Sequence, residues 1–236
     1  MLEKTTTQRV IPIESPSFVR EEHLREAGNP VFLFPRRCPL AMEIGCGTGD
    51  FIVQLARRRP DLNFLAVDIY NQGCLKTCRK VDRQQLDNIR VLRMEARYLM
   101  TRYLGPASLE ALYLNCPDPW PKKRHHPRRL VNAGFLEMVR YFLAAGGEFF
   151  FCTDFSDYAQ QVAALFPFPG LDNCLPAPCV SRLEGYPFSK YMRNFSESGQ
   201  PLYFMRYRKA SRFPGSELAP PPFSASNSPL LGGGAA

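Results

Sequence analysis

The chain has 236 residues, of which 45% are hydrophobic, enough for one domain of ordinary size with its own core. Thirty lysines and arginines against 22 acidic residues give a formal net charge of +8, which favours a polyanionic partner such as nucleic acid. No apolar run approaches the length of about 18 residues typical of a membrane helix, so no membrane span is expected.

The eight cysteines are expected to be reduced thiols in a cytoplasmic protein, because the start of the chain lacks the apolar stretch of a signal peptide. The pairs Cys74/Cys78 and Cys174/Cys179 do not have the CxxC spacing of zinc sites, and the chain has three histidines in all. A bound metal is therefore not expected. The sequence leaves open whether the protein is a monomer or a homodimer.

Three regions are expected along the chain. Residues 1–30 are polar and are predicted to be a partly flexible leader with one short helix at residues 21–27. Residues 31–210 are predicted to form a folded domain. Residues 211–236 are rich in Pro, Ser and Gly and are predicted to be a disordered tail.

Within the domain, short apolar strands alternate with helical patterns. Five strands are predicted, at residues 40–45, 63–68, 88–94, 109–114 and 147–154. Helices are predicted at residues 50–59, 70–86, 128–145 and 155–166, with a further short helix before residue 109. Residues 171–189 are expected to be irregular, and a last, basic strand is predicted at residues 201–209. This alternation favours an α/β fold with a parallel sheet covered by helices on both faces.

Acidic residues stand at the ends of the predicted strands. They are Glu43, Asp68, Glu95, Asp118 and Asp154. In parallel sheets, ligands lie at the carboxyl ends of the strands, near the point where the strand order reverses. Five acidic residues at five strand ends are harder to explain by chance than one, so this edge of the sheet is the predicted ligand site.

A glycine loop follows the first predicted strand and precedes a helix. Gly45, Gly47 and Gly49 form a GxGxG turn, which allows a ligand to approach the backbone closely. The dinucleotide pattern GxGxxG would require a glycine at position 50, where this chain has Asp50. Glu43 would repel a pyrophosphate but suits a cationic ligand, so S-adenosylmethionine is favoured over NAD. Asp68 is then expected to accept the ribose hydroxyls, and Glu95 to reach the adenine amine.

The stretch LNCPDPWPKKRHHPRR, residues 114–129, combines a rigid loop with a cationic segment. Prolines at alternate positions are expected to hold the residues before them in extended conformations, including Asp118 and Trp120. The basic residues that follow are predicted to contact RNA phosphates: Lys122, Lys123, Arg124, Arg128 and Arg129. A simpler interpretation is a stiff surface turn followed by a solvated charge run. Trp120 is expected to pack in the core rather than to stack on a base.

Five stretches of the chain resemble, in order and spacing, the bacterial tRNA (guanine-N7-)-methyltransferases over roughly residues 38–208. They are MEIGCGTGDF, LAVDIY, NCPDPWPKKRHHPRRLV, CTDFSDYA and SKYMRNFSESGQPLYF. The glycine motif is shared by very many methyltransferases, whereas PDPWPKKRHHPRR is much more specific. The resemblance implies a Rossmann-like class I methyltransferase fold, with a mostly parallel seven-stranded sheet and an antiparallel late strand.

The resemblance also implies roles for individual residues. Glu43, Asp68, Glu95 and Asp118 match the family's cofactor positions, and Asp118 also matches its proposed catalytic residue. Lys122 and Asp154 match positions that contact the substrate, and the late substrate segment corresponds to Ser189, Lys190, Tyr191 and Met192. Met192 stands where the family commonly has a glutamate.

The expected reaction is transfer of a methyl group to N7 of a guanine in the variable loop of tRNA. Guanine N7 has a free lone pair at neutral pH, so Asp118 is expected to orient the base rather than to remove a proton. Two alternatives remain open at the level of sequence. One is methylation of an exocyclic amine, because Asp118-Pro119-Trp120 loosely resembles the loop of such enzymes. The other is a tRNA-binding module without turnover, for which Met192 is the hint.

Overall fold

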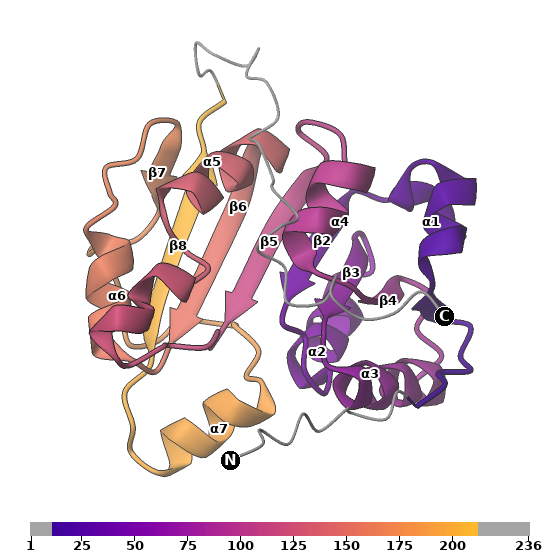
Figure 1. Cartoon of the computed structure of the whole chain (residues 1–236), viewed down its shortest axis with the longest axis horizontal. Helices are drawn as coiled ribbons and strands as arrows, with labels where there is room; N and C mark the ends of the chain where they lie inside the picture. The colour runs from indigo at the N-terminus through magenta and orange to yellow at the C-terminus, as the bar shows by residue number, and fades with distance from the viewer. Residues whose placement is uncertain (1–10, 212–236) are drawn as a thin grey trace, which may run out of the picture.

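The apolar runs of the sequence form one eight-stranded sheet in the computed structural model, which describes residues 11–211 (Figure 1). The order of the strands is β1-β4-β3-β2-β5-β6-β8-β7. Strands β1 to β6 run parallel to one another, and β8 is antiparallel to both β6 and β7. The strands are β1 (Phe18–Val19), β2 (Leu40–Ile44), β3 (Asn63–Asp68), β4 (Ile89–Arg93), β5 (Leu109–Asn115), β6 (Leu143–Thr153), β7 (Leu171–Asn173) and β8 (Tyr203–Lys209).

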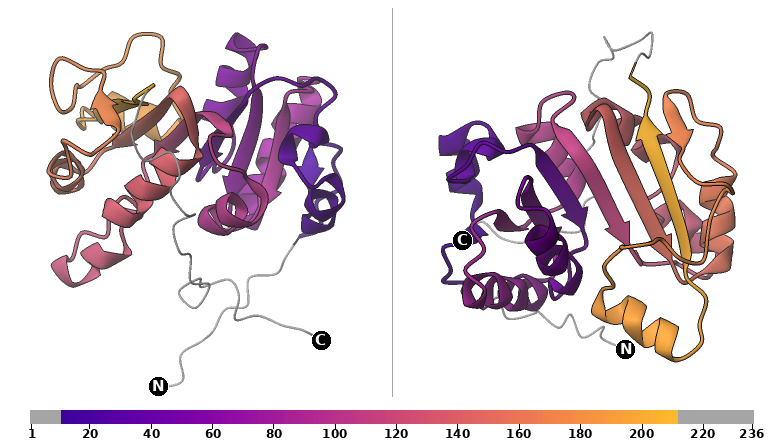
Figure 2. Two further views of the ribbon diagram at one scale, coloured as in Figure 1. Left: turned by 90° about the horizontal axis from the view of Figure 1, so that it is seen from above. Right: turned by 180° about the vertical axis from the view of Figure 1, so that it is seen from behind.

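Helices cover both faces of the sheet (Figure 2). They are α1 (Glu21–Ala27), α2 (Asp50–Arg58), α3 (Asn71–Arg83), α4 (Ala96–Tyr103), α5 (Ala133–Phe142), α6 (Ser156–Ala163) and α7 (Lys190–Glu197), with 3₁₀ turns η1 (Pro30–Leu33) and η2 (Lys123–Arg128). Helices α2 and α3 pack on one face, and α4, α5 and α6 on the other.

Strand β2 shows how the period of two along a strand divides the core. Leu40, Met42 and Ile44 belong to the cluster under α4, α5 and α6, whereas Ala41 belongs to the cluster under α2 and α3. Glu43 shares the face of Ala41 because alternate side chains of a strand point to the same side. A carboxyl group is thereby placed in an apolar layer directly before the glycine loop.

The predicted fold class is confirmed, with one addition. The seven-stranded sheet that the resemblance implied has an eighth strand, β1, whose two residues pair in parallel with β4 at the edge of the sheet. Leu24 of α1 is fully buried, and Glu21 accepts hydrogen bonds from the hydroxyls of Tyr98 and Tyr103. Residues 18–27 therefore share the core of the domain, and setting them apart as a partly flexible leader was wrong. Residues 1–10 and the predicted tail from residue 212 onward lie outside the described residues.

The helix predicted at residues 128–145 is shorter than expected. The basic run forms η2, and α5 begins only after Asn132, whose side chain accepts a hydrogen bond from the backbone N–H of Phe135. Gly146 and Gly147 do not end this helix, since they lie within β6, where the register with β5 shifts. A Cβ atom at Gly147 would lie 3.0 Å from the carbonyl oxygens of Ala144 and Leu109, which explains the glycine.

Besides β1, two further elements were missed by the sequence patterns. Strand β7 lies within residues expected to be irregular, and α7 comes after them as a short helix between two loops. Among residues 11–211, none of the helices has the length and apolar character needed to cross a membrane. In the same part of the chain, no three His, Cys, Asp or Glu side chains are grouped as metal ligands would be.

Candidate active site

The glycine loop joins β2 to α2 through three residues with positive φ. Gly45, Gly47 and Gly49 have φ values of 75°, 53° and 77°. A Cβ atom at Gly49 would lie 2.7 Å from the side chain of Thr77, so this position excludes any larger residue. The loop is fixed by the Gly47 N–H, which donates to Asp68 over 2.7 Å, and by the Thr77 hydroxyl, which donates to the Gly47 carbonyl over 3.0 Å.

Glu43 lies beneath this loop with one carboxyl oxygen unsatisfied. The residue is 2% exposed, and its Oε1 accepts a hydrogen bond from the Asn115 amide over 3.2 Å. Its Oε2 is buried and has no hydrogen-bond partner. The pKa of Glu43 is raised to about 8, chiefly by burial and also by the nearby carboxylates of Asp68 and Asp50, while the hydrogen bond from Asn115 acts in the opposite direction. Such a group is well suited to receive a cationic ligand.

A cleft of about 390 Å³ opens at the carboxyl ends of β2, β3, β4 and β5. Gly45, Asp68, Glu95 and Asp118 all line it, so four of the predicted cofactor residues meet at one place. Asp68 accepts backbone hydrogen bonds from Gly47 and Tyr70. Glu95 caps α4 by accepting from the Tyr98 N–H over 2.8 Å, and its other oxygen pairs with Arg97. The carboxylates of Asp68 and Glu95 are thus held in place by their own loop or helix.

The proline loop after β5 is rigid, but not in the way that the sequence indicated. Cys116 and Trp120 have φ values of 45° and 43°, so they are not in the extended conformation expected before proline. Tertiary hydrogen bonds hold both ends of the loop: the Cys116 N–H donates to the Cys152 carbonyl, and Arg129 donates to the Pro119 carbonyl. Positive φ at residues other than glycine costs about 1–3 kcal/mol and is typical of functional loops.

Trp120 is not the core residue that was expected. It lines the cleft, and its ring contacts the imidazole of His125 at 5.7 Å between centroids and the guanidinium of Arg128 at 4.9 Å. Asp118 is exposed within the same loop. The loop therefore presents one carboxylate and one aromatic ring beside the cleft.

The basic segment divides into exposed residues and one buried residue. Lys122, Lys123, Arg124 and Arg128 are exposed, as phosphate contacts require. The predicted phosphate contact by Arg129 is wrong, because its side chain is 0% exposed. Its guanidinium donates to Asp157 and Gln161, each over 2.6 Å, and to the Pro119 carbonyl over 2.8 Å. Arg129 instead ties the proline loop to α6.

The late segment also combines exposed and buried positions. Asp154 follows β6 and is partly exposed. The Ser189 hydroxyl caps α7 by accepting a hydrogen bond from the Met192 N–H over 3.2 Å. Lys190 is exposed, and Tyr191 is 63% exposed. Met192 is 0% exposed and packs with Cys152, Leu202 and Phe204, so its predicted substrate contact is wrong. The methionine anchors α7 to the sheet.

Two polar residues of the site were not predicted. The Tyr186 hydroxyl donates to Asn115 Oδ1 over 2.8 Å, and the Asn115 amide in turn donates to Glu43. Asn115 was detectable as a polar residue at the end of an apolar strand. Tyr186 was not, because it reaches the site from a loop 71 residues further along the chain.

Comparison with known proteins agrees with this geometry. The profile of a family described as "Putative methyltransferase" matches residues 37–204. The crystal structure of the 16S rRNA methyltransferase KamB has a TM-score of 0.55 at 14% identity, covering 86% of this chain and 97% of that one, which is a similarity of fold alone.

Two sequence relatives are far closer, and both are named tRNA (guanine-N(7)-)-methyltransferase. The protein of Syntrophotalea carbinolica is 49% identical over 217 residues, which are 92% of this chain and 94% of that protein. The protein of Geobacter metallireducens is 46% identical over 206 residues, which are 86% of this chain and 98% of that protein. The chain therefore belongs to the tRNA (guanine-N7-)-methyltransferase family.

Proposed function

We propose that this protein transfers the methyl group of S-adenosylmethionine to N7 of a guanine in the variable loop of tRNA. The observation that carries the proposal is the buried carboxyl of Glu43, open on one oxygen beneath a glycine loop and next to a cleft with a basic rim. The names of the relatives support the same activity. They do not favour the exocyclic-amine or non-catalytic alternatives, and the burial of Met192 removes the main hint of lost function.

The residues of the cleft fit the cofactor. Glu43 Oε2 lacks a partner, and an ammonium group would satisfy it while returning the buried carboxyl to its ionised form. At Gly45 and Gly47, no atom lies within 4 Å of where a Cβ would stand, which leaves open space above the loop. Asp68 and Glu95 would receive the ribose hydroxyls and the adenine amine. When bound, S-adenosylmethionine supplies a methyl group activated by its sulfonium.

Asp118 and Asp154 would orient the guanine. Both follow the ends of neighbouring strands, β5 and β6, at the same edge of the sheet. Their carboxylates can accept hydrogen bonds from the N–H groups of the base, so that the N7 lone pair is directed into the cleft. No proton has to leave N7 before it attacks, so catalysis can come mostly from alignment for in-line displacement, an effect that can reach about 7–11 kcal/mol.

The exposed cations would bind the tRNA backbone. Arg128 lines the cleft, and Lys122, Lys123 and Arg124 precede it as exposed residues of the same basic segment, so that all four can contact phosphates without regard to base sequence. Choice of the guanine then depends on the shape of the RNA and on the pocket, after the base has left its stack. The exposed ring of Tyr191, with Ser189 and Lys190 beside it, offers a surface for stacking.

We also infer a cytoplasmic location. The eight cysteines are all free thiols, as a reducing compartment requires.

The test is transfer of a labelled methyl group to two unmodified tRNA transcripts, one with and one without a guanine in the variable loop. We expect labelling only of the transcript that has this guanine, and chain cleavage by aniline after mild reduction at the labelled site. A labelled base that resists this cleavage would refute the assignment to N7. Equal labelling of both transcripts would refute the assignment to the variable loop.

A further inference from the structure

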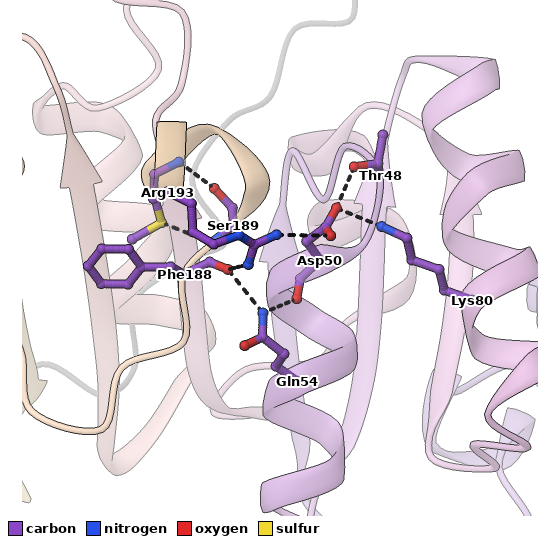
Figure 3. A network of polar contacts seen from close by, with 8 residues as sticks. Thr48, Asp50, Gln54, Lys80, Phe188, Ser189 and Arg193 are labelled. Carbon is purple, nitrogen blue, oxygen red and sulfur yellow. Dashed lines mark hydrogen bonds and ion pairs between the residues drawn. The ribbon is translucent and has the colours of Figure 1, made fainter. Parts of the chain in front are cut away.

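Asp50, which stands where a dinucleotide-binding loop would have its last glycine, is the centre of a polar network (Figure 3). Its Oδ2 accepts hydrogen bonds from the Thr48 hydroxyl and from the Lys80 ammonium, each over 2.6 Å. Its Oδ1 is 3.3 Å from Nη2 of Arg193. One carboxylate therefore joins the glycine loop, α3 and α7.

Hydrogen bonds of this network attach α7 to α2, in addition to the packing of Met192 against the sheet. Met192 is the buried residue of this helix, which lies between two loops beside α2 (Figure 1). On the side facing α2, Gln54 donates to the Asp50 carbonyl over 2.6 Å and to the Phe188 carbonyl over 3.0 Å. Arg193 donates to the same Phe188 carbonyl over 2.8 Å. The start of α7 is thus tied to the first turn of α2.

The ion pair at Asp50 is charged at neutral pH. Burial raises the pKa of Asp50, but hydrogen bonds from Lys80 and Thr48 and the charges of Lys80 and Arg193 lower it below its usual range overall. Because Lys80 and Thr48 occupy the other oxygen, removal of Arg193 leaves the carboxylate paired and the glycine loop supported. Arg193 is therefore the member of the network whose loss should affect α7 specifically.

We propose that Asp50 and Arg193 are positioning residues that couple cofactor binding to tRNA binding. The glycine loop contacts the cofactor, and α7 begins with the residues assigned to the guanine, Ser189 to Tyr191. A cofactor bound against the glycine loop stabilises the arrangement in which Asp50, through Arg193, holds α7 where these residues meet the base. The inference rests on the proposed function. By linkage, tRNA must then strengthen cofactor binding by the same factor.

The test is a binding cycle with S-adenosylhomocysteine and an unmodified tRNA transcript that has a guanine in the variable loop. The affinity for tRNA is measured by fluorescence anisotropy with and without saturating S-adenosylhomocysteine. In the wild type we expect S-adenosylhomocysteine to raise the affinity at least about fivefold, the lower end of typical couplings. In Arg193→Met and Asp50→Asn we expect less than about a twofold rise, and in the double variant no further loss, because both changes break one link.

Arg36→Met is the matched control, because Arg36 forms an ion pair with Asp87 at a similar distance of 3.2 Å, away from the glycine loop and α7. It should keep the coupling of the wild type, and thermal unfolding should show all variants folded. Wild-type coupling in Arg193→Met, or no coupling in the wild type, would overturn the proposal. The assay needs no turnover, so absence of methylation at N7 would refute the proposed function while the coupling would still be measured.

Discussion

Arg128 and Arg129 are neighbours in the chain, but replacing each by methionine is expected to have opposite consequences. Arg128 is exposed beside the cleft, whereas the side chain of Arg129 is 0% exposed and makes hydrogen bonds to Asp157, Gln161 and the Pro119 carbonyl. Arg129→Met should destabilise the fold and leave the phosphate surface in place. Arg128→Met should weaken tRNA binding and leave the fold unchanged.

The size of the effect of Arg129→Met follows from the environment of its partners. A hydrogen bond to a charged group contributes about 1.5–3 kcal/mol, but Asp157 is 54% exposed and water can solvate it after the change. Methionine also fills much of the space of the arginine stem. We therefore expect a loss of about 2 kcal/mol in the free energy of unfolding, which lowers Tm by roughly 4–8 °C in a domain of this size.

Two measurements separate the variants. Thermal unfolding should show the decrease in Tm for Arg129→Met and almost none for Arg128→Met. Binding of tRNA as a function of salt should show a slope smaller by about 1 for Arg128→Met and an unchanged slope for Arg129→Met at a temperature where it is folded. An Arg129→Met protein as stable as the wild type, but with the smaller slope, would refute the structural role of Arg129.

Three further changes test the interior of the site. Glu43→Gln should weaken binding of S-adenosylhomocysteine, measured by calorimetry, and should stabilise the free protein. Because the pKa of Glu43 is raised from its usual value of 4.5 to about 8, the folded state binds more protons than the unfolded state between these two pH values. Wild-type stability therefore falls as pH rises toward 8, and the gain in Tm of the variant should be larger at pH 8.5 than at pH 5.5. Tyr186→Phe leaves the Asn115 acceptor without its donor, and should lower the free energy of unfolding by about 1–3 kcal/mol in urea denaturation. Met192→Glu places a carboxyl group among Cys152, Leu202 and Phe204, so we expect a lower Tm and less methyl transfer; a stable variant with higher activity would contradict this.

Features that depend on short stretches of sequence were predicted well. The apolar runs became strands, the glycines took positive φ between β2 and α2, and acidic residues met at the carboxyl ends of the strands. These features depend on local periodicity or on the φ of single residues, together with the rule that the carboxyl ends of parallel strands meet at the same edge of a sheet. The register shift in β6 escaped prediction because the reason for Gly147 is a close approach to the backbone at Leu109, on another strand.

The errors at the site have a common physical origin in contacts between distant segments. Arg129 belongs to a cationic run in the sequence, but Asp157 and Gln161 on α6 turn it inward, and no pattern within the run distinguishes it from Arg128. Met192 was assigned to the substrate because its segment resembles the substrate segment of the family, whereas its environment is set by Cys152 and Phe204 across the sheet. Asp50 and Arg193, which form an ion pair, are 143 residues apart in the sequence. Local sequence determines which chemical groups reach the cleft, and tertiary contacts determine which of them face the ligands and which hold the others in place.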